Sequence, residues 1–307
     1  MMEISSLIRI ENKNLLVDIF PGGGGKMTSI YNKKSGYEFL WRNEALDLKT
    51  YEPGSEYDPV FYGGVDELLP NDVPENVDGM EFPDHGELWT QSLTASIKND
   101  CLTLQGFLPV SKLSYQKSIR LDEDGPFIHT DYAITNENTL AVKFLWKLHA
   151  ALKIRKGDRM ICRADKGRVV DPLYSRFKQT APFQWPVIEK TDVSVIPEKN
   201  GTMDFFYIYE LEDGEVGIVN EEHAYFGYRF DKLVFPYVWL FASYGGFLDH
   251  YTAILEPCTT MPVSVNDAAR LGQTMILQPG ETVNTRVTII AGSYLDYKIN
   301  NKPNENR

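Results

Sequence analysis

The sequence lacks features that several large classes of protein require. Its three cysteines, Cys101, Cys162 and Cys258, are far apart and form no Cys-x-x-Cys pair. This spacing argues against a zinc site and against a disulfide framework. The chain also has no long apolar run and no basic, signal-like start. We therefore expect neither a signal peptide nor a transmembrane segment, and we expect a cytoplasmic protein.

Positive charge is also scarce. Lys and Arg number 31 against 43 Asp and Glu, so the formal net charge is −12. A chain this acidic is not expected to bind nucleic acid or the anionic surface of a membrane. It also has no general attraction for a phosphorylated substrate, which would need a local basic patch.

A glycine-rich stretch, Pro21–Gly25 followed by Lys26, does not meet the requirements of a nucleotide-binding loop. Met27 stands where a phosphate loop needs Ser or Thr, and Phe20 stands where its first glycine belongs. No glycine follows Gly24 at the spacing of a dinucleotide fingerprint. We therefore interpret the stretch as a tight turn between strands.

What the chain does have is the pattern of a β protein. Its 17 Tyr, 16 Phe and 17 Pro favour strands and turns over long helices. The clearest predicted meander comprises residues 93–97, 102–108, 113–121 and 127–134. Roughly twenty such strands, with turn signals about every 8–12 residues, predict an all-β sandwich or barrel. We expect one domain over residues 1–296, a polar tail over 297–307, and one short helix at Asn266–Gln273.

Residues 63–89 carry an unusual charge pattern. The stretch contains no Lys or Arg and eight carboxylates: Asp66, Glu67, Asp72, Glu75, Asp78, Glu81, Asp84 and Glu87. Its prolines suggest a long excursion over the surface, and long loops often carry function. The spacing does not match a calcium-binding loop, so we expect a solvated acidic loop rather than a metal site.

The stretch Tyr251–Pro262 reads as a buried strand that carries a carboxylate. Alternation places Glu256 on the same face as Thr252 and Ile254. Pro257 has no N–H to donate, so strand pairing should weaken after Glu256. A carboxylate held rigidly at the edge of a cavity suits a general base. The alternative is an ordinary solvent-facing Glu at a strand end.

Two further stretches each bring a histidine. In Phe144–Leu152, alternation puts Lys147 and His149 on one face of an otherwise apolar strand, which indicates a polar cavity or a partly exposed sheet face. Phe82–Trp89 places His85 in a tight turn. The tryptophans that could supply a flat stacking surface for a sugar ring, or simply pack in the core, are Trp89, Trp146 and Trp239.

Together these motifs resemble the galactose mutarotase-like (aldose 1-epimerase) superfamily. The matching segments are Gly63-Gly64, Pro83-Asp-His85-Gly86, Trp146-Lys-Leu-His149, Leu255-Glu256-Pro257 and a hairpin ending at Trp41. The resemblance extends from about Ile8 to Ile290. It implies an antiparallel β-supersandwich and a sugar epimerase that needs no cofactor or metal.

The resemblance also implies roles for individual residues. Glu256 matches the general base of the family, His149 its general acid, and His85 its substrate-positioning histidine. Such an enzyme takes a proton from the anomeric hydroxyl and gives one to the ring oxygen, which a carboxylate and an imidazolium can do at neutral pH. The expected substrate-binding residues are His85, Lys147, Trp89 and Trp239.

Two departures from the family pattern leave the sugar open. Leu148 precedes His149 and Ala150-Ala151 follow it, where the family carries Asn and Tyr-Phe. Residues 63–89 also lack the Arg that binds sugar hydroxyls. We expect an aldose 1-epimerase-like enzyme for an unphosphorylated sugar, as a monomer or homodimer with no nucleic-acid or membrane partner. The alternatives are a non-catalytic carbohydrate-binding protein of the same fold, or another sugar-active enzyme such as a lyase or hydrolase.

Overall fold

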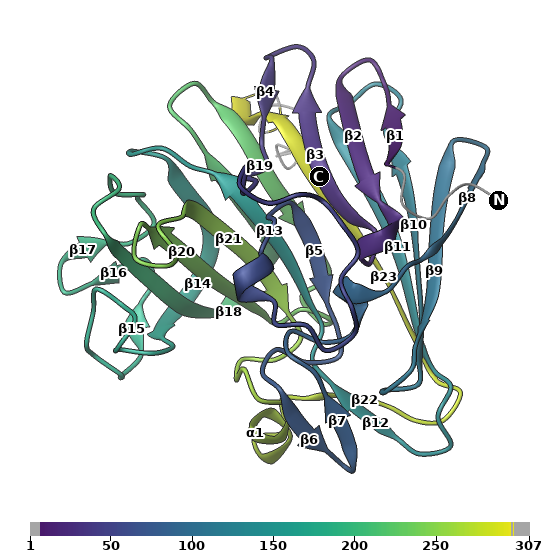
Figure 1. The fold of residues 1–307 in the computed structure, drawn as a ribbon. Helices are drawn as coiled ribbons and strands as arrows, with labels where there is room; N and C mark the ends of the chain where they lie inside the picture. Colours follow the sequence, from purple (N-terminus) through teal and green to yellow (C-terminus); the bar gives the residue numbers. More distant parts are fainter. Residues whose placement is uncertain (1–6, 296, 298–307) are drawn as a thin grey trace, which may run out of the picture.

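The chain forms one large antiparallel sheet that folds over on itself (Figure 1). The computed structural model describes residues 7–295 and Tyr297. The long strand β18 (Thr202–Val219) belongs to both halves of the sheet, because its first part pairs with β20 and its last part with β19. The prediction of an antiparallel β-supersandwich is confirmed.

The first half of the sheet is the predicted meander extended by two later strands. Its strands, in spatial order, are β8 (Thr94–Lys98), β9 (Cys101–Leu108), β10 (Leu113–Leu121), β11 (Phe127–Asn136), β23 (Thr282–Ser293) and β19 (Ala224–Arg229). In β11 buried residues alternate with partly exposed ones, as expected for a strand with one face on the core. Ile128, Tyr132 and Ile134 point inward.

The second half of the sheet starts from the other end of β18. Its strands, in spatial order, are β20 (Tyr237–Tyr244), β21 (Tyr251–Cys258), β13 (Lys147–Lys153), β5 (Val65–Leu68), β3 (Lys26–Asn32), β2 (Leu15–Phe20) and β1 (Ile8–Glu11). Buried side chains from both halves, among them Val17, Leu104 and Leu148, belong to one hydrophobic core.

The remaining elements extend or border the main sheet. Three further strands belong to the main sheet: β4 (Tyr37–Glu38), β14 (Arg159–Val169) and β15 (Phe183–Gln184). Three separate pairs of strands are β6 (Glu75–Val77) with β7 (Met80–Phe82), β12 (Val142–Phe144) with β22 (Met275–Leu277), and β16 (Val187–Ile188) with β17 (Thr191–Asp192). The 3-10 turns are η1 (Pro21–Gly23), η2 (Asp58–Val60) and η3 (Leu88–Thr90). Figure 1 places β6, β7, β12, β22 and helix α1 together at one end of the molecule.

The predicted helix is present but shorter than expected. Helix α1 spans Val265–Arg270, and the Ser264 side chain caps it by accepting a hydrogen bond from the Asp267 N–H. The Glu75 carboxylate accepts hydrogen bonds from the Val265 N–H and the Ser264 hydroxyl, which ties the β6–β7 hairpin to the helix.

None of the helices in the described part of the chain has the length and hydropathy needed to cross a bilayer. The predicted tail 297–307 lies outside the described residues except for Tyr297.

Two local predictions are corrected. Residues 63–89 are not a solvated acidic loop, because they include strand β5 and bury four of their carboxylates: Asp66, Glu67, Asp72 and Glu87. The pairing of β21 also does not end at Glu256. The strand continues to Cys258, with Pro257 opposite Val238 of β20, and the ladder is interrupted only on the β13 side.

Buried lysines from other strands neutralise part of this acidic stretch. Glu67 points into the core, where its carboxylate lies 2.8 Å from Lys117 Nζ and accepts a hydrogen bond from the Tyr132 hydroxyl at 2.7 Å. The side chains of Glu67 and Lys117 are almost completely excluded from solvent. An ion pair this deeply buried depends on both partners, because either charge alone would be left without solvent or counter-ion.

This pair yields a stability prediction. Lys117→Met should lower the free energy of unfolding by about 3–5 kcal/mol, since it leaves the Glu67 carboxylate buried and unpaired. The double variant Glu67→Met/Lys117→Met should recover much of that loss. Urea unfolding followed by fluorescence measures both. Lys166→Met, which removes an exposed pair with Glu210, is the control and should cost less than about 1 kcal/mol. Equal effects of Lys117→Met and Lys166→Met would contradict the argument.

Candidate active site

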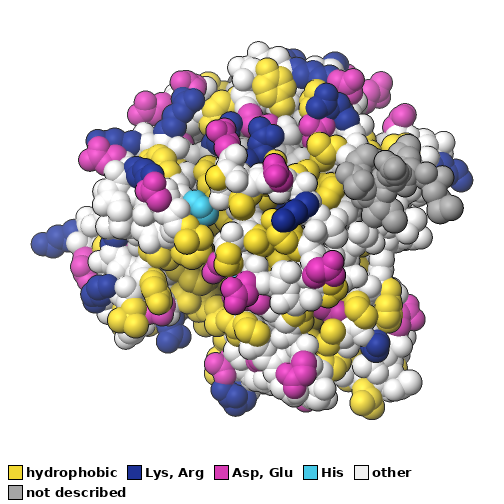
Figure 2. Space-filling view, in the orientation of Figure 1, with side chains coloured by type: hydrophobic (Ala, Val, Ile, Leu, Met, Phe, Trp, Pro, Cys, Tyr) yellow, Lys and Arg dark blue, Asp and Glu magenta, His cyan; other side chains and the backbone are white. Residues whose placement is uncertain are grey.

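A cavity of about 180 Å³ opens on the outer face of the second half of the sheet. Twelve residues line it: Tyr57, Asp58, Phe61, Asp72, His85, Lys147, His149, Phe205, Phe241, Phe247, Ile254 and Glu256. Figure 2 shows hydrophobic side chains gathered in a hollow over the region where Figure 1 places β18, β20 and β21. The cavity therefore combines a cluster of ionisable groups with an aromatic wall.

Strand register brings the ionisable groups together. His149 of β13 pairs with Asp66 of β5, and Glu256 of β21 pairs with Trp239 of β20. The pairs Lys147–Cys258 and Ala150–Leu255 on either side put His149 directly across from Glu256. Hydrogen-bond pairing between β13 and β21 is interrupted at this point, next to Pro257, which has no N–H to donate. The catalytic candidates thus lie in one row across neighbouring strands.

Glu256 is held against a buried lysine. It is 2% exposed, and its Oε2 lies 2.6 Å from Lys147 Nζ, which lies equally close to Asp72 Oδ1. Burial raises the pKa of Glu256 to about 7, although the positive charge of Lys147 opposes the rise. Burial also disfavours the charged form of Lys147, but the two carboxylates outweigh this and raise its pKa. Glu256 can therefore exchange a proton near neutral pH while Lys147 stays charged.

His149 is a buried, neutral imidazole. Its Nδ1 lies 3.4 Å from the Tyr57 hydroxyl, which donates its hydrogen to Asp66 at 2.7 Å. Because that hydrogen is already used, the Tyr57 oxygen can only accept from His149, which favours the tautomer protonated at Nδ1. Burial, together with the charges of Lys147 and His85, lowers the pKa of His149 well below its usual value. Lys26, 2.9 Å from the same Asp66 oxygen, completes this cluster.

His85 has the opposite surroundings. Its Nδ1 lies 2.9 Å from Asp84 Oδ1, and its Nε2 lies 3.9 Å from Asp72 and 4.0 Å from Asp58. Burial lowers the pKa of His85, but the hydrogen bond to Asp84 and the charge of Asp72 outweigh burial and raise it. The ring stacks on Tyr57, with centroids 4.5 Å apart. The surroundings of His85 therefore favour its protonated form, whereas those of His149 favour the neutral one.

The His85-Gly86 motif has a backbone cause. Gly86 has a φ of +80°, and a Cβ there would lie 2.3 Å from the Leu69 carbonyl oxygen. The His85 N–H donates to the Asp72 carbonyl at 2.7 Å, which closes the loop on itself. Glycine at this position lets the loop pass close to Leu69 and present the His85 side chain to the cavity.

The predicted tryptophans do not line the cavity. Trp239 is fully buried behind it, with Lys147 Nζ 4.6 Å from its ring centre. Trp89 packs against Tyr57 and Tyr51 on the far side of the cavity wall. Sequence reasoning missed the residues that do line it, including Asp58 and Tyr57 from a turn-rich stretch. Phe205 and Phe241 each belong to a row of aromatic residues at alternating positions, 205 and 207 in β18 and 237, 239 and 241 in β20, which is the one signal that could have revealed them.

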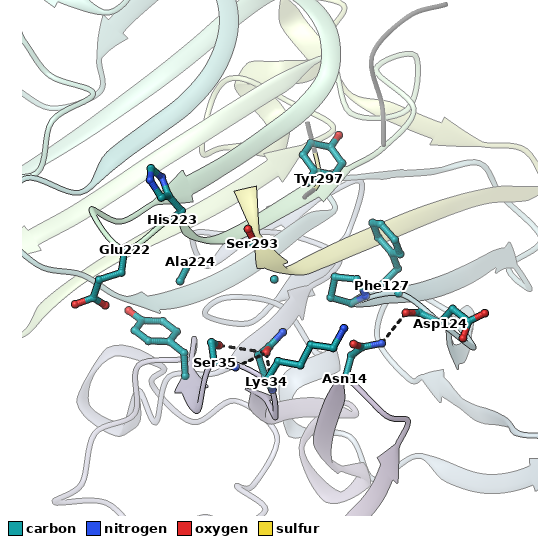
Figure 3. A pocket seen from close by; sticks show the side chains of 15 residues that line it. Asn14, Lys34, Ser35, Asp124, Phe127, Glu222, His223, Ala224, Ser293 and Tyr297 are labelled. Carbon is teal, nitrogen blue, oxygen red and sulfur yellow. Dashed lines mark hydrogen bonds between the residues drawn. The ribbon is translucent and has the colours of Figure 1, made fainter. Parts of the chain in front are cut away.

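A larger cavity, of about 430 Å³, lies between turns (Figure 3). Its described polar side chains largely support the turns: Asn14 donates to the Asp124 carbonyl, and Asn32 accepts from the N–H groups of Lys34 and Ser35. Its histidine, His223, is exposed. The paired carboxylates, lysine and two histidines that acid–base chemistry needs belong to the smaller cavity.

Fold and site together define a β-supersandwich protein with a buried acid–base cavity. A protein from Escherichia coli K12, provisionally named an aldose 1-epimerase, matches with a TM-score of 0.72 and 15% identity, over 94% of this chain and 99% of its own. A galactose mutarotase-like protein from Clostridium acetobutylicum matches with a TM-score of 0.68 and 16% identity, over 95% of this chain and 97% of its own. A Synechocystis protein matches with a TM-score of 0.72 and 13% identity, over 94% and 96% of the two chains.

No family profile and no curated protein sequence matches the chain. The solved structures nevertheless cover nearly its whole length at high structural similarity. The chain has the galactose mutarotase-like fold, as the sequence motifs predicted.

The raised pKa of Glu256 leads to a prediction for stability. Between its ordinary value of 4.5 and its folded value of about 7, the folded state holds a proton that the unfolded state releases. The contribution of Glu256 to the free energy of unfolding should therefore fall as pH rises through this window. Urea unfolding of the wild type and of Glu256→Gln at several pH values measures the difference. As pH rises through this window, the free energy of unfolding of the wild type should fall relative to that of the variant. If the two free energies change in parallel with pH, the raised pKa is contradicted.

Proposed function

We propose that the protein is an aldose 1-epimerase-like enzyme that interconverts the α and β anomers of an unphosphorylated sugar. The observation that carries the proposal is a carboxylate with a pKa near neutral, Glu256, in the same small cavity as a histidine with a raised pKa, His85. Opening a cyclic hemiacetal needs one group to accept a proton and another to donate one, without any cofactor. The names of the structural neighbours agree with this chemistry.

In the proposed reaction Glu256 accepts the proton of the anomeric hydroxyl. As that C–O bond becomes a carbonyl, the bond between C1 and the ring oxygen breaks, and the ring oxygen takes a proton from His85 Nε2. Rotation about the C1–C2 bond presents the other face of the aldehyde. Ring closure then returns each proton by the reverse path, so that neither residue changes over a full cycle.

The family resemblance assigns the acid to His149, but the surroundings of the two histidines favour His85. Carboxylates face both nitrogens of His85, which favours a proton on each of them. His149 holds its single proton toward the Tyr57 hydroxyl and has a lowered pKa. We therefore propose that His149 positions the sugar by accepting a hydrogen bond from it, while His85 donates the proton.

Lys147 has a double role in this proposal. Its charge keeps the Glu256 pKa from rising further, so that a fraction of the carboxylate is ionised at neutral pH. The same ion pair is the specific observation that favours the second candidate function, a non-catalytic carbohydrate-binding protein. In that case Lys147 would hold Glu256 permanently and prevent it from accepting a proton.

Glu256→Gln tests the base. The variant keeps the shape of the side chain but removes proton acceptance, so kcat should fall by about 10²–10⁴-fold. Polarimetry on freshly dissolved α-anomers of several hexoses and pentoses measures the rate. Glu222→Gln, at the exposed rim of the larger cavity, is the matched control and should keep the wild-type rate. A Glu256→Gln enzyme as fast as wild type would show that the base is misassigned. A wild type that binds a sugar by calorimetry but epimerises none would favour the binding protein.

Replacing the histidines separately distinguishes their roles. His85→Asn should lower kcat by about 10²–10⁴-fold and remove the alkaline limb of the pH–rate profile, because it removes the proton donor. His149→Asn should mainly raise KM and leave that limb in place, because a positioning group is lost. The opposite pattern would return the acid role to His149, as the family resemblance implies.

A further inference from the structure

The charges around the cavity do not balance. The carboxylates that line or adjoin it are Asp58, Asp66, Asp72, Asp84 and Glu256. The basic groups are Lys26, Lys147 and His85, so three basic side chains face five carboxyl groups. Arg168, the next cation along the sheet, is exposed on β14 opposite Tyr207 and does not line the cavity. Enclosed negative charge of this kind is costly unless a cation or a proton arrives.

One ammonium group serves two of the buried carboxylates. Glu256 Oε2 and Asp72 Oδ1 each lie 2.6 Å from Lys147 Nζ, so they share a single positive charge. Both residues are more than nine-tenths buried and line the cavity. At the rim, Asp58 keeps 54% of its side chain exposed, and within residues 7–295 its nearest cation is His85 Nε2, 4.0 Å away. Burial raises its pKa, in keeping with the excess of negative charge.

The aromatic part of the lining forms a cup rather than a flat platform. Phe205 and Phe241 meet at an interplanar angle of 71°, and Phe241 and Phe247 meet at 85°. A flat platform would suit the face of a pyranose ring, whereas rings at steep angles surround a compact group. Aromatic faces attract ammonium groups, and the site already uses that contact where Lys147 lies over Trp239.

We propose that the sugar taken by this cavity carries a protonated amine, which binds between the Asp58 carboxylate and the Phe205–Phe241–Phe247 cup. This inference names the class of sugar for the proposed function. Only the measurement of epimerisation rests on that function, because the binding measurement does not require catalysis. An ammonium group donates hydrogen bonds to the Asp58 carboxylate, which lies 4.0 Å from His85 Nε2, and adds positive charge to a cavity with more acidic than basic side chains. The same charges reject phosphorylated sugars and sugar acids, for which the cavity offers no free cation among the described residues.

Calorimetry and polarimetry on matched pairs test the proposal: glucosamine against glucose, galactosamine against galactose, and mannosamine against mannose. At about pH 7 and low salt the aminohexose of at least one pair should bind about tenfold more tightly than its parent. The preference should shrink with added salt and disappear when the amine is deprotonated. Asp58→Asn should reduce it by about three- to ten-fold. Glu56→Gln, on the exposed turn beside it, should leave it unchanged.

The outcomes separate this inference from the catalytic proposal. Equal affinity within every pair, or equal responses of Asp58→Asn and Glu56→Gln, would overturn the amine preference even if neutral sugars are epimerised. Tight, salt-sensitive binding of an aminohexose without epimerisation would uphold it and defeat the catalytic proposal. Preferred binding of 6-deoxyhexoses over aminohexoses would also overturn it, because the cup would then be holding a methyl group.

Discussion

The arrangement of the cavity depends on one buried ammonium group, that of Lys147. It lies between Asp72 and Glu256, 2.6 Å from each, and over the ring of Trp239. Without it two carboxylates would face each other in a space from which water is largely excluded, and both would have to be protonated or moved apart. With it, the loop that carries Asp72 is held against the sheet and Glu256 keeps a pKa near neutral. A single side chain thus connects the stability of the site with the proton transfer proposed for it.

The same principle operates at three places along one acidic stretch. Asp66 faces Lys26, Glu67 faces Lys117 and Asp72 faces Lys147. Successive residues of β5 point to opposite faces of the sheet, so Asp66 supports the cavity while Glu67 enters the core. Each lysine comes from a different strand. The acidic stretch is therefore held by long-range ion pairs in addition to its own hydrogen bonds, such as that from the His85 N–H to the Asp72 carbonyl. These ion pairs explain how a sequence without Lys or Arg can be buried.

This is also where prediction from sequence reached its limit. Alternation placed Glu256 and Ile254 on one face correctly, and turn signals located most strands, because both depend on neighbouring residues. The burial of residues 63–89 depends instead on lysines far along the chain, which no local pattern reveals. The same holds for Trp89 and Trp239, since residue type does not tell which side of a cavity wall a ring occupies. The family motifs identified the histidines but not their protonation.

The protonation of each histidine depends on the charge and the hydrogen-bonding capacity of the groups around it. Carboxylates near both nitrogens of an imidazole stabilise its doubly protonated, charged form, as at His85. An imidazole facing a hydroxyl whose hydrogen is already donated elsewhere gains no such stabilisation, as at His149. Tyr57 contributes to both environments, because its ring stacks on His85 while its oxygen faces His149. The Tyr57 oxygen therefore favours the neutral form of His149, while the carboxylates around His85 favour the protonated form of that ring. In the proposed reaction this difference makes His85 the proton donor, and Glu256 remains the proton acceptor.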